Sequence, residues 1–204
     1  MPNKPMLDNS SEREVKNFLK KNGVLFVGEN DLGHIIEVRN KRPDLLIYSV
    51  DDLNIEKKPR CLIEIESFES PGPLDKMMNN IGPIDGKKLS NPIKNKLRHA
   101  KAQLKPYCEL DIPRVILVDN LNRVGVDLFN CFFSAFFHDA HRREYISAIS
   151  IFCYSRSFDE SEQGFFLRVF HNPYARDKLC GDVFGNKIIL ENFILNGGNW
   201  AAAY

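Results

Sequence analysis

The chain has 204 residues, of which 43% are hydrophobic and 27% charged, and its formal net charge is +1. This composition is too apolar for a disordered chain, and it predicts one domain, 1–204, with a sizeable core. No apolar run reaches the roughly 18–20 residues of a membrane span, so no membrane is expected as a partner. The charge balance excludes a general polycation, the type of chain that binds nucleic acid without a defined site.

The number and spacing of the cysteines indicate that their thiols are reduced. The five of them are scattered and form no Cys-x-x-Cys pair, so a structural zinc site is not expected. Most lie in apolar segments, where a reduced cysteine behaves as a small hydrophobe. The start of the chain has no apolar segment typical of a secretory signal. Together these features indicate a cytoplasmic protein.

The first half of the chain alternates between helix and strand patterns. Ser11 suits a helix N-cap, apolar residues follow at helical spacing, and Asn22-Gly23 ends the pattern. Strands are then expected at 24–27, 43–48 and 61–66, with 35–38 continuing the sheet. After a proline-rich loop, the sequence predicts a helix over 91–105, with Asn91 as its cap and Pro106 at its end.

The second half predicts a strand at 113–118, a buried helix at 126–137 and two late strands at 145–154 and 165–170. A helix between the third and fourth strands suggests a crossover connection. The expected fold is therefore α/β, with a central mixed sheet flanked by helices in the order α-β-β-β-α-β. Residues 11–120 would form the core, and 121–204 an extension with a helix and two strands.

Three carboxylates fall on neighbouring predicted strands. Asp44 follows Pro43 at the head of one strand, and Glu64 and Glu66 share one side of the next, with Ile65 on the opposite side. Hard divalent cations bind such groups of carboxylate and carbonyl oxygens. The alternative is that the two glutamates mark a solvated strand face and Asp44 a turn.

Pro43-Asp44, Glu64-Ile65-Glu66 and the element order around them resemble the PD-(D/E)XK nuclease superfamily, over roughly residues 11–120. The resemblance implies a restriction-endonuclease-like fold. It also implies that Asp44 and Glu64 hold Mg²⁺, for which Mn²⁺ would substitute, with the Ile65 carbonyl as a further ligand.

Glu66 departs from the family pattern, which most often has a lysine there to orient or deprotonate the attacking water. Two outcomes stay open: Glu66 ligates the metal or steers the water, or the site has drifted towards binding without cleavage. A lysine from the following helix could also reach the site.

Glu14, on the first predicted helix, is a further candidate, because many members of the family bring an acid from that helix to the metal. Its competing role is local. Ser11-x-x-Glu14 fits a capping box, in which the Glu14 side chain bonds the Ser11 backbone N–H. The sequence leaves both roles open.

The helix predicted at 91–105 lies in a strongly basic stretch. Between Lys87 and Lys105 there are six lysines, one arginine and no acidic residue. One stripe of the helix is apolar and packs on the sheet, and the stripe beside it carries four cations. These four would contact a phosphate backbone: Lys94, Arg98, Lys101 and Lys105.

Gln103 and Tyr107 also resemble the QxxxY element of the RecB-like branch of the superfamily, where both residues sit near the substrate strand. Pro106 lies inside this element and is expected to end the helix before Tyr107.

The sequence therefore predicts a Mg²⁺-dependent nuclease that hydrolyses phosphodiester bonds, with DNA rather than RNA as its partner. Asp44, Glu64 and Glu66 would form the catalytic site, and Gln103 and Lys101 would face the phosphate. A second hypothesis is an inactive nuclease-fold module that binds DNA or a protein. A third makes the aromatic-rich helix at 126–137 a homodimer surface.

Overall fold

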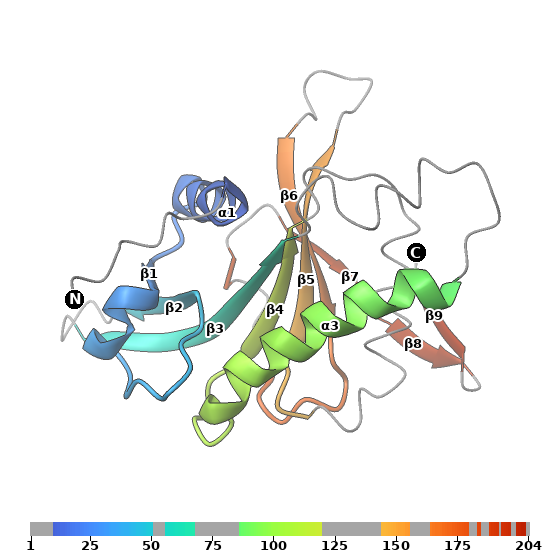
Figure 1. Cartoon of the computed structure of the whole chain (residues 1–204). Helices are drawn as coiled ribbons and strands as arrows, with labels where there is room; N and C mark the ends of the chain where they lie inside the picture. The colour runs from blue at the N-terminus through green and yellow to red at the C-terminus, as the bar shows by residue number, and fades with distance from the viewer. Residues whose placement is uncertain are drawn as a thin grey trace.

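The structure is a computed structural model, and it describes residues 10–50, 56–67, 86–119, 144–155, 164–179, 183–184, 188–191, 193–196 and 199–202 (Figure 1). In chain order the elements are α1 (Ser10–Lys21), β1 (Phe26–Gly28), the 3₁₀ helix η1 (Glu29–His34), β2 (Leu45–Val50), β3 (Lys57–Ser67), α3 (Gly86–Leu104), the 3₁₀ helix η2 (Lys105–Tyr107), β4 (Arg114–Asp119), β5 (Ala148–Ser155), β6 (Gly164–His171), β7 (Ile188–Glu191), β8 (Phe193–Asn196) and β9 (Asn199–Ala202).

The strands form one mixed sheet of seven, ordered β1 to β7 as in the sequence, and a separate hairpin of β8 and β9. The first three strands are antiparallel, whereas β3, β4 and β5 run parallel. The segment that joins β3 to β4 contains α3, as a parallel pair requires a crossover. The predicted α/β class and mixed sheet are confirmed, and the observed order α1-β1-β2-β3-α3-β4 agrees with the predicted one.

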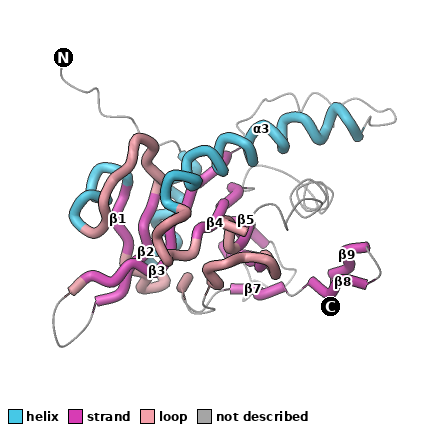
Figure 2. Tube along the Cα trace, turned by 90° about the horizontal axis from the view of Figure 1, so that it is seen from below, coloured by secondary structure: helices cyan, strands magenta, loops and turns pink. Residues whose placement is uncertain are grey.

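Among the described residues, one α-helix packs on each face of the sheet. On one face, Leu97, Ala100 and Leu104 of α3 pack in a core cluster with alternate residues of β2 to β6. On the other face, Val15 and Leu19 of α1 pack with the intervening residues of the same strands. Both helices follow the apolar spacing of an amphipathic helix. Figures 1 and 2 show α3 lying obliquely across the sheet.

The end of α1 was predicted from Asn22-Gly23, and the structure gives the reason. Gly23 has a φ of 72°, in the left-handed region that glycine adopts without strain. The N–H of Val24 donates to the Leu19 carbonyl at 3.0 Å, and that of Gly23 to the Lys20 carbonyl at 3.1 Å. This pattern is a Schellman motif, which satisfies the last carbonyls of the helix.

Two predictions about elements were wrong. Residues 35–38 form no strand; their apolar side chains, Ile35, Ile36 and Val38, pack against the α3-side core instead. The second helix begins at Gly86, so Asn91 is not its cap. Hydrophobic spacing identified the packed face of this helix, but it did not mark the residue at which the helix begins.

The two late strands belong to the main sheet. β5 pairs with β4, and β6 pairs with β5 in an antiparallel register from Ala148–His171 to Ser155–Gly164. They therefore continue the sheet that β1 to β4 begin. The sequence analysis had placed these two strands in the extension 121–204. The helix expected at 126–137 lies outside the described residues. The division into a core, 11–120, and an extension, 121–204, stays a prediction.

Arg114 anchors the connection that follows α3. Its side chain is fully buried at the start of β4, and its guanidinium pairs with Asp177. It also donates to four backbone carbonyls, those of Tyr107, Leu110, Ile112 and Tyr145. A planar guanidinium with five donors can serve this many acceptors at once. This network fixes the C-terminal end of α3 against the sheet.

None of the helices in the described part of the chain combines the length and apolar composition that a membrane span needs.

Candidate metal centre

Two buried glutamates of β3 point towards α3. Glu64 and Glu66 are each 4% exposed. Leu62, two residues earlier, packs in the core cluster under α3, whereas Ile63 and Ile65 pack with the cluster under α1. This alternation confirms that both glutamates share one face of the strand. Two acids on the buried face of a central strand carry a high desolvation cost unless they have partners.

Asp44 lies beside this pair. The antiparallel register places Leu45 of β2 opposite Ile63 of β3. As a result, Oδ2 of Asp44 accepts a hydrogen bond from the Ile65 N–H at 2.6 Å. The backbone N–H of Asp44 in turn bonds the carboxylate of Glu64. The structure thus brings Asp44, Glu64 and Glu66 together at one place on the sheet, as expected from the sequence.

Burial and neighbouring charges raise the pKa values of Asp44 and Glu64. Burial raises the pKa of Asp44 to about 6; the Ile65 N–H opposes this rise, and the charges of Glu12, Glu29 and Glu66 add to it. Burial, followed by the charges of Asp44 and Glu66, raises the pKa of Glu64 to about 10. Without a compensating cation, Glu64 therefore holds a proton at neutral pH.

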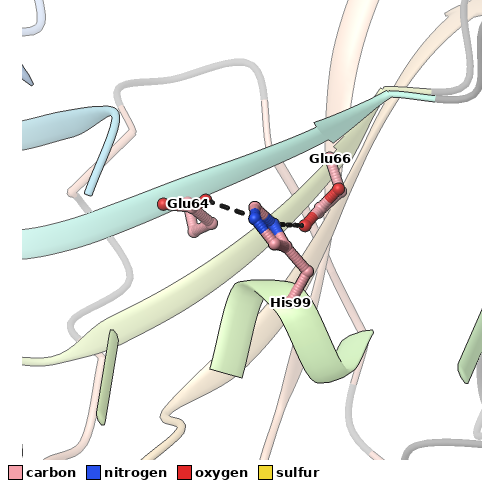
Figure 3. Close-up of side chains that lie close together, drawn as sticks. All are labelled: Glu64, Glu66 and His99. Carbon is pink, nitrogen blue, oxygen red and sulfur yellow. Dashed lines mark hydrogen bonds and ion pairs between the residues drawn. The ribbon is translucent and has the colours of Figure 1, made fainter. Parts of the chain in front are cut away.

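Two nitrogen-bearing side chains, one imidazole and one ammonium, reach the acidic pair from α3. Nδ1 of His99 lies 2.8 Å from Oε1 of Glu66 and 3.9 Å from Oε1 of Glu64. Figure 3 shows the imidazole between the two carboxylates. Nζ of Lys96 lies 3.2 Å from Oε2 of Glu66. Both α3 side chains are open to solvent, with 63% of His99 and 42% of Lys96 exposed.

This group has the donors of a metal site. Glu64, Glu66 and His99 each offer one ligand atom, and these atoms all lie within 4.8 Å of one another. Oε2 of Glu64 is buried and has no hydrogen-bond partner among the described residues. A buried carboxylate oxygen without a partner is costly, and a divalent cation would satisfy it. The residues present therefore fit a divalent metal ion.

The first helix contributes charge through a residue that the sequence analysis did not select. Glu12, and not Glu14, is among the acids that raise the pKa of Asp44. Glu12 also pairs with Lys16 at 2.6 Å, one helical turn away. Because α1 begins at Ser10, Glu14 lies within its second turn. The metal-ligand role of Glu14 stays a prediction, as does that of the Ile65 carbonyl.

The basic residues of α3 and of the turn that follows it differ in how far their side chains are exposed to solvent. Lys94, Arg98 and Lys105 are exposed, and Arg98 donates to Asn95 at 3.1 Å. Lys101 and Gln103 are half-buried and lie beyond His99 along the helix. Their expected contacts with a phosphate backbone stay predictions.

Tyr107 occupies a place that the resemblance did not lead us to expect. Its side chain is fully buried, so it is not a surface for a substrate strand. Its hydroxyl accepts from the Arg39 N–H at 3.1 Å and donates to the Lys41 carbonyl at 2.7 Å. As Pro106 indicates, α3 ends at Leu104 and a 3₁₀ turn follows. Tyr107 holds the loop that leads to Asp44.

His99 is the main residue that the sequence analysis missed. It lies three residues after Lys96, so the two side chains share a stripe along the edge of the packed face of α3. That spacing was present in the sequence. The cationic stripe drew attention to the opposite edge of the helix, away from the acidic pair.

Comparison of the chain with known protein families, with curated proteins and with solved structures finds no significant match.

Proposed function

We propose that this protein is a divalent-metal-dependent nuclease that hydrolyses phosphodiester bonds, with DNA rather than RNA as its substrate. The observation that carries the proposal is the convergence of Asp44, Glu64 and Glu66 beside Lys96 and His99 of α3. The order of elements is that of the resemblance stated above, and it supports the proposal.

In this proposal the three acids have different roles. Asp44 and Glu64 hold Mg²⁺ or Mn²⁺, and the Ile65 N–H fixes the orientation of the Asp44 carboxylate. Glu66 either completes the ligand set or orients the attacking water. When bound, the metal ion polarises the scissile phosphate, activates a water and stabilises the leaving oxygen.

Lys96 takes the place of the lysine that the family has on the strand. Its ammonium reaches Glu66 from α3. A cation and a carboxylate therefore lie next to each other where the attacking water would bind. Such a pair can hold a water for attack and stabilise the negative charge that develops on the phosphate. His99 either ligates the metal or orients Glu66, because its Nδ1 faces both glutamates.

The non-cleaving module is the second candidate, and one observation favours it. Both oxygens of Glu66 already have partners on α3, Oε1 in the imidazole of His99 and Oε2 in the ammonium of Lys96. An ion-paired cluster of this kind can serve as a fixed support for the fold. The unpartnered Oε2 of Glu64 argues for the nuclease instead, because a purely structural cluster leaves it unsatisfied.

The test is a cleavage assay on linear, circular and single-stranded DNA and on RNA, with Mg²⁺, Mn²⁺ or EDTA. The nuclease hypothesis predicts cleavage with either metal and none in EDTA. It also predicts that Asp44→Asn abolishes cleavage, whereas Asp111→Asn, at an exposed position, retains it. Cleavage by the Asp44→Asn protein at the wild-type rate would show that the site is assigned wrongly.

A further inference from the structure

A groove lies between the loop that precedes β2 and the C-terminal end of α3. Its walls are formed by Arg39, Asn40 and Lys41 on the loop side and by Ala102, Lys105 and Pro106 on the helix side. Its volume is about 840 Å³. Sites of roughly 300–1,000 Å³ accommodate small organic ligands, so this groove can hold nucleotide units.

The loop side of the groove is held in place by the protein itself. The Tyr107 hydroxyl bridges the Arg39 N–H and the Lys41 carbonyl, at 3.1 and 2.7 Å. Because Tyr107 is fully buried, this bridge is shielded from competing water. The groove therefore exists before any ligand binds, and its ligand does not have to order the loop.

Three cations line the groove. They are Arg39, Lys41 and Lys105, and the acids Glu37 and Glu109 lie beside them. The Arg39 guanidinium lies 3.6 Å from the Glu37 carboxylate, and the Arg39 side chain is 38% exposed. A partly exposed guanidinium matches the paired oxygens of a phosphate.

Both walls of the groove lead to the acidic cluster. His99, Ala102 and Pro106 follow at spacings of three and four residues, so one side of the helical segment connects the cluster to the groove. Six residues separate His99 from Lys105, a rise of about 9 Å at 1.5 Å per residue. On the other wall, the chain runs from Lys41 to Asp44 in three residues.

We propose that this groove binds the nucleotides of a single nucleic-acid strand next to the phosphate that the acidic cluster cleaves. The inference rests on the proposed function and names the path of its substrate. Arg39 and Lys105 contact the phosphates, and the apolar parts of Val38, Ala102 and Pro106 lie against sugars or bases.

Binding is tested by fluorescence anisotropy with a labelled ten-nucleotide oligothymidylate in EDTA, so that no cleavage intervenes. The double variant Arg39→Gln/Lys105→Gln should weaken binding at least tenfold. Its affinity should also depend less on salt, since each lost single-strand phosphate contact lowers the slope of log K against log salt by about 0.7. Lys20→Gln/Lys21→Gln, at exposed positions of α1, is the matched control and should bind as the wild type.

A second readout uses Cys108, a half-buried thiol that lines the groove. Bound oligothymidylate should slow its alkylation by iodoacetamide at least tenfold, as quantified by peptide mass spectrometry. The buried Cys61 serves as an internal reference. An unprotected Cys108, together with unchanged affinity of the double variant, would overturn the groove as the binding path.

The two proposals fail in different ways. Should the wild type cut nucleic acid with Mg²⁺ or Mn²⁺ while the groove variants keep wild-type affinity, the nuclease stands and the groove is wrong. Should the wild type neither bind nor cut any of the nucleic acids in the presence of metal, the proposed function and the groove both fall.

Discussion

Nζ of Lys96 lies 3.2 Å from Oε2 of Glu66, so a lysine of α3 contacts the strand residue at which the nucleases that the sequence resembles most often have lysine. The two residues are thirty positions apart in the sequence, and the packing of α3 on β3 brings them together. A cation is thus supplied to the acidic cluster although the strand carries glutamate. This contact leads to the first prediction.

Lys96→Met should lower the rate of metal-dependent cleavage by about 10²-fold, the lower end of what a group that handles protons in the reaction contributes. The affinity for Mn²⁺ should change little, because Lys96 cannot ligate a metal as an ammonium. Single-turnover kinetics at saturating Mn²⁺ measure the rate, and calorimetry measures the affinity.

Two further variants show whether the positive charge at this position is what matters. Lys96→Arg keeps the positive charge and should recover part of the rate, whereas Lys20→Met, on α1, should cleave as the wild type. If Lys96→Met cleaved at the wild-type rate, Lys96 would be no more than a surface partner of Glu66.

The stability of the metal-free protein should fall as the pH rises. Glu64 holds its proton up to a pKa of about 10 in the folded state, against 4.5 in an ordinary glutamate. The folded state therefore binds more protons than the unfolded state between these values, so the free energy of unfolding decreases with increasing pH. The effect is at most about 1.4 kcal/mol for each pH unit.

Glu64→Gln imitates the protonated carboxyl and should flatten this dependence. Thermal melts in EDTA from pH 5 to pH 9 should show a smaller loss of Tm for Glu64→Gln than for the wild type. Glu56→Gln, at an exposed position, should follow the wild type. Parallel curves for wild type and Glu64→Gln would contradict the raised pKa of Glu64.

Tyr107→Phe should destabilise the protein by about 1–3 kcal/mol, because it leaves the Arg39 N–H and the Lys41 carbonyl without their shared partner. Urea denaturation measures this loss. Hydrogen exchange should increase at residues 39–41 while the exchange of β4 changes little. Unchanged exchange of the loop would show that Tyr107 does not hold it.

The sequence predicted the parts of the fold that follow from local patterns. Alternation in β3 placed Glu64 and Glu66 on one face, and the apolar spacing of α3 identified Leu97, Ala100 and Leu104 as its buried side. Apolar content alone did not distinguish a strand at 35–38 from a loop that packs on the core. That distinction depends on tertiary packing of Ile35, Ile36 and Val38 against the core cluster on the α3 side, which no local pattern contains.

The acidic part of the site was predictable because strand neighbours follow from short connections. Asp44 directly precedes β2, and Glu64 lies on β3, the adjacent antiparallel strand, so their proximity needed little beyond the strand assignments. His99 and Lys96 depend on how α3 is rotated and shifted over the sheet. The Arg114 network, which fixes one end of α3, joins residues that are far apart in the chain. No sequence pattern predicted it.

The central claim is that Asp44, Glu64 and Glu66 form a divalent-metal site, and titration calorimetry with Mn²⁺ tests it most directly. The account predicts saturable Mn²⁺ binding to the wild type and to the exposed-site control Glu56→Gln. In Glu64→Gln, which loses the carboxylate with the unpartnered oxygen, this binding should be lost. Mn²⁺ binding by Glu64→Gln with wild-type heat and affinity would contradict the account.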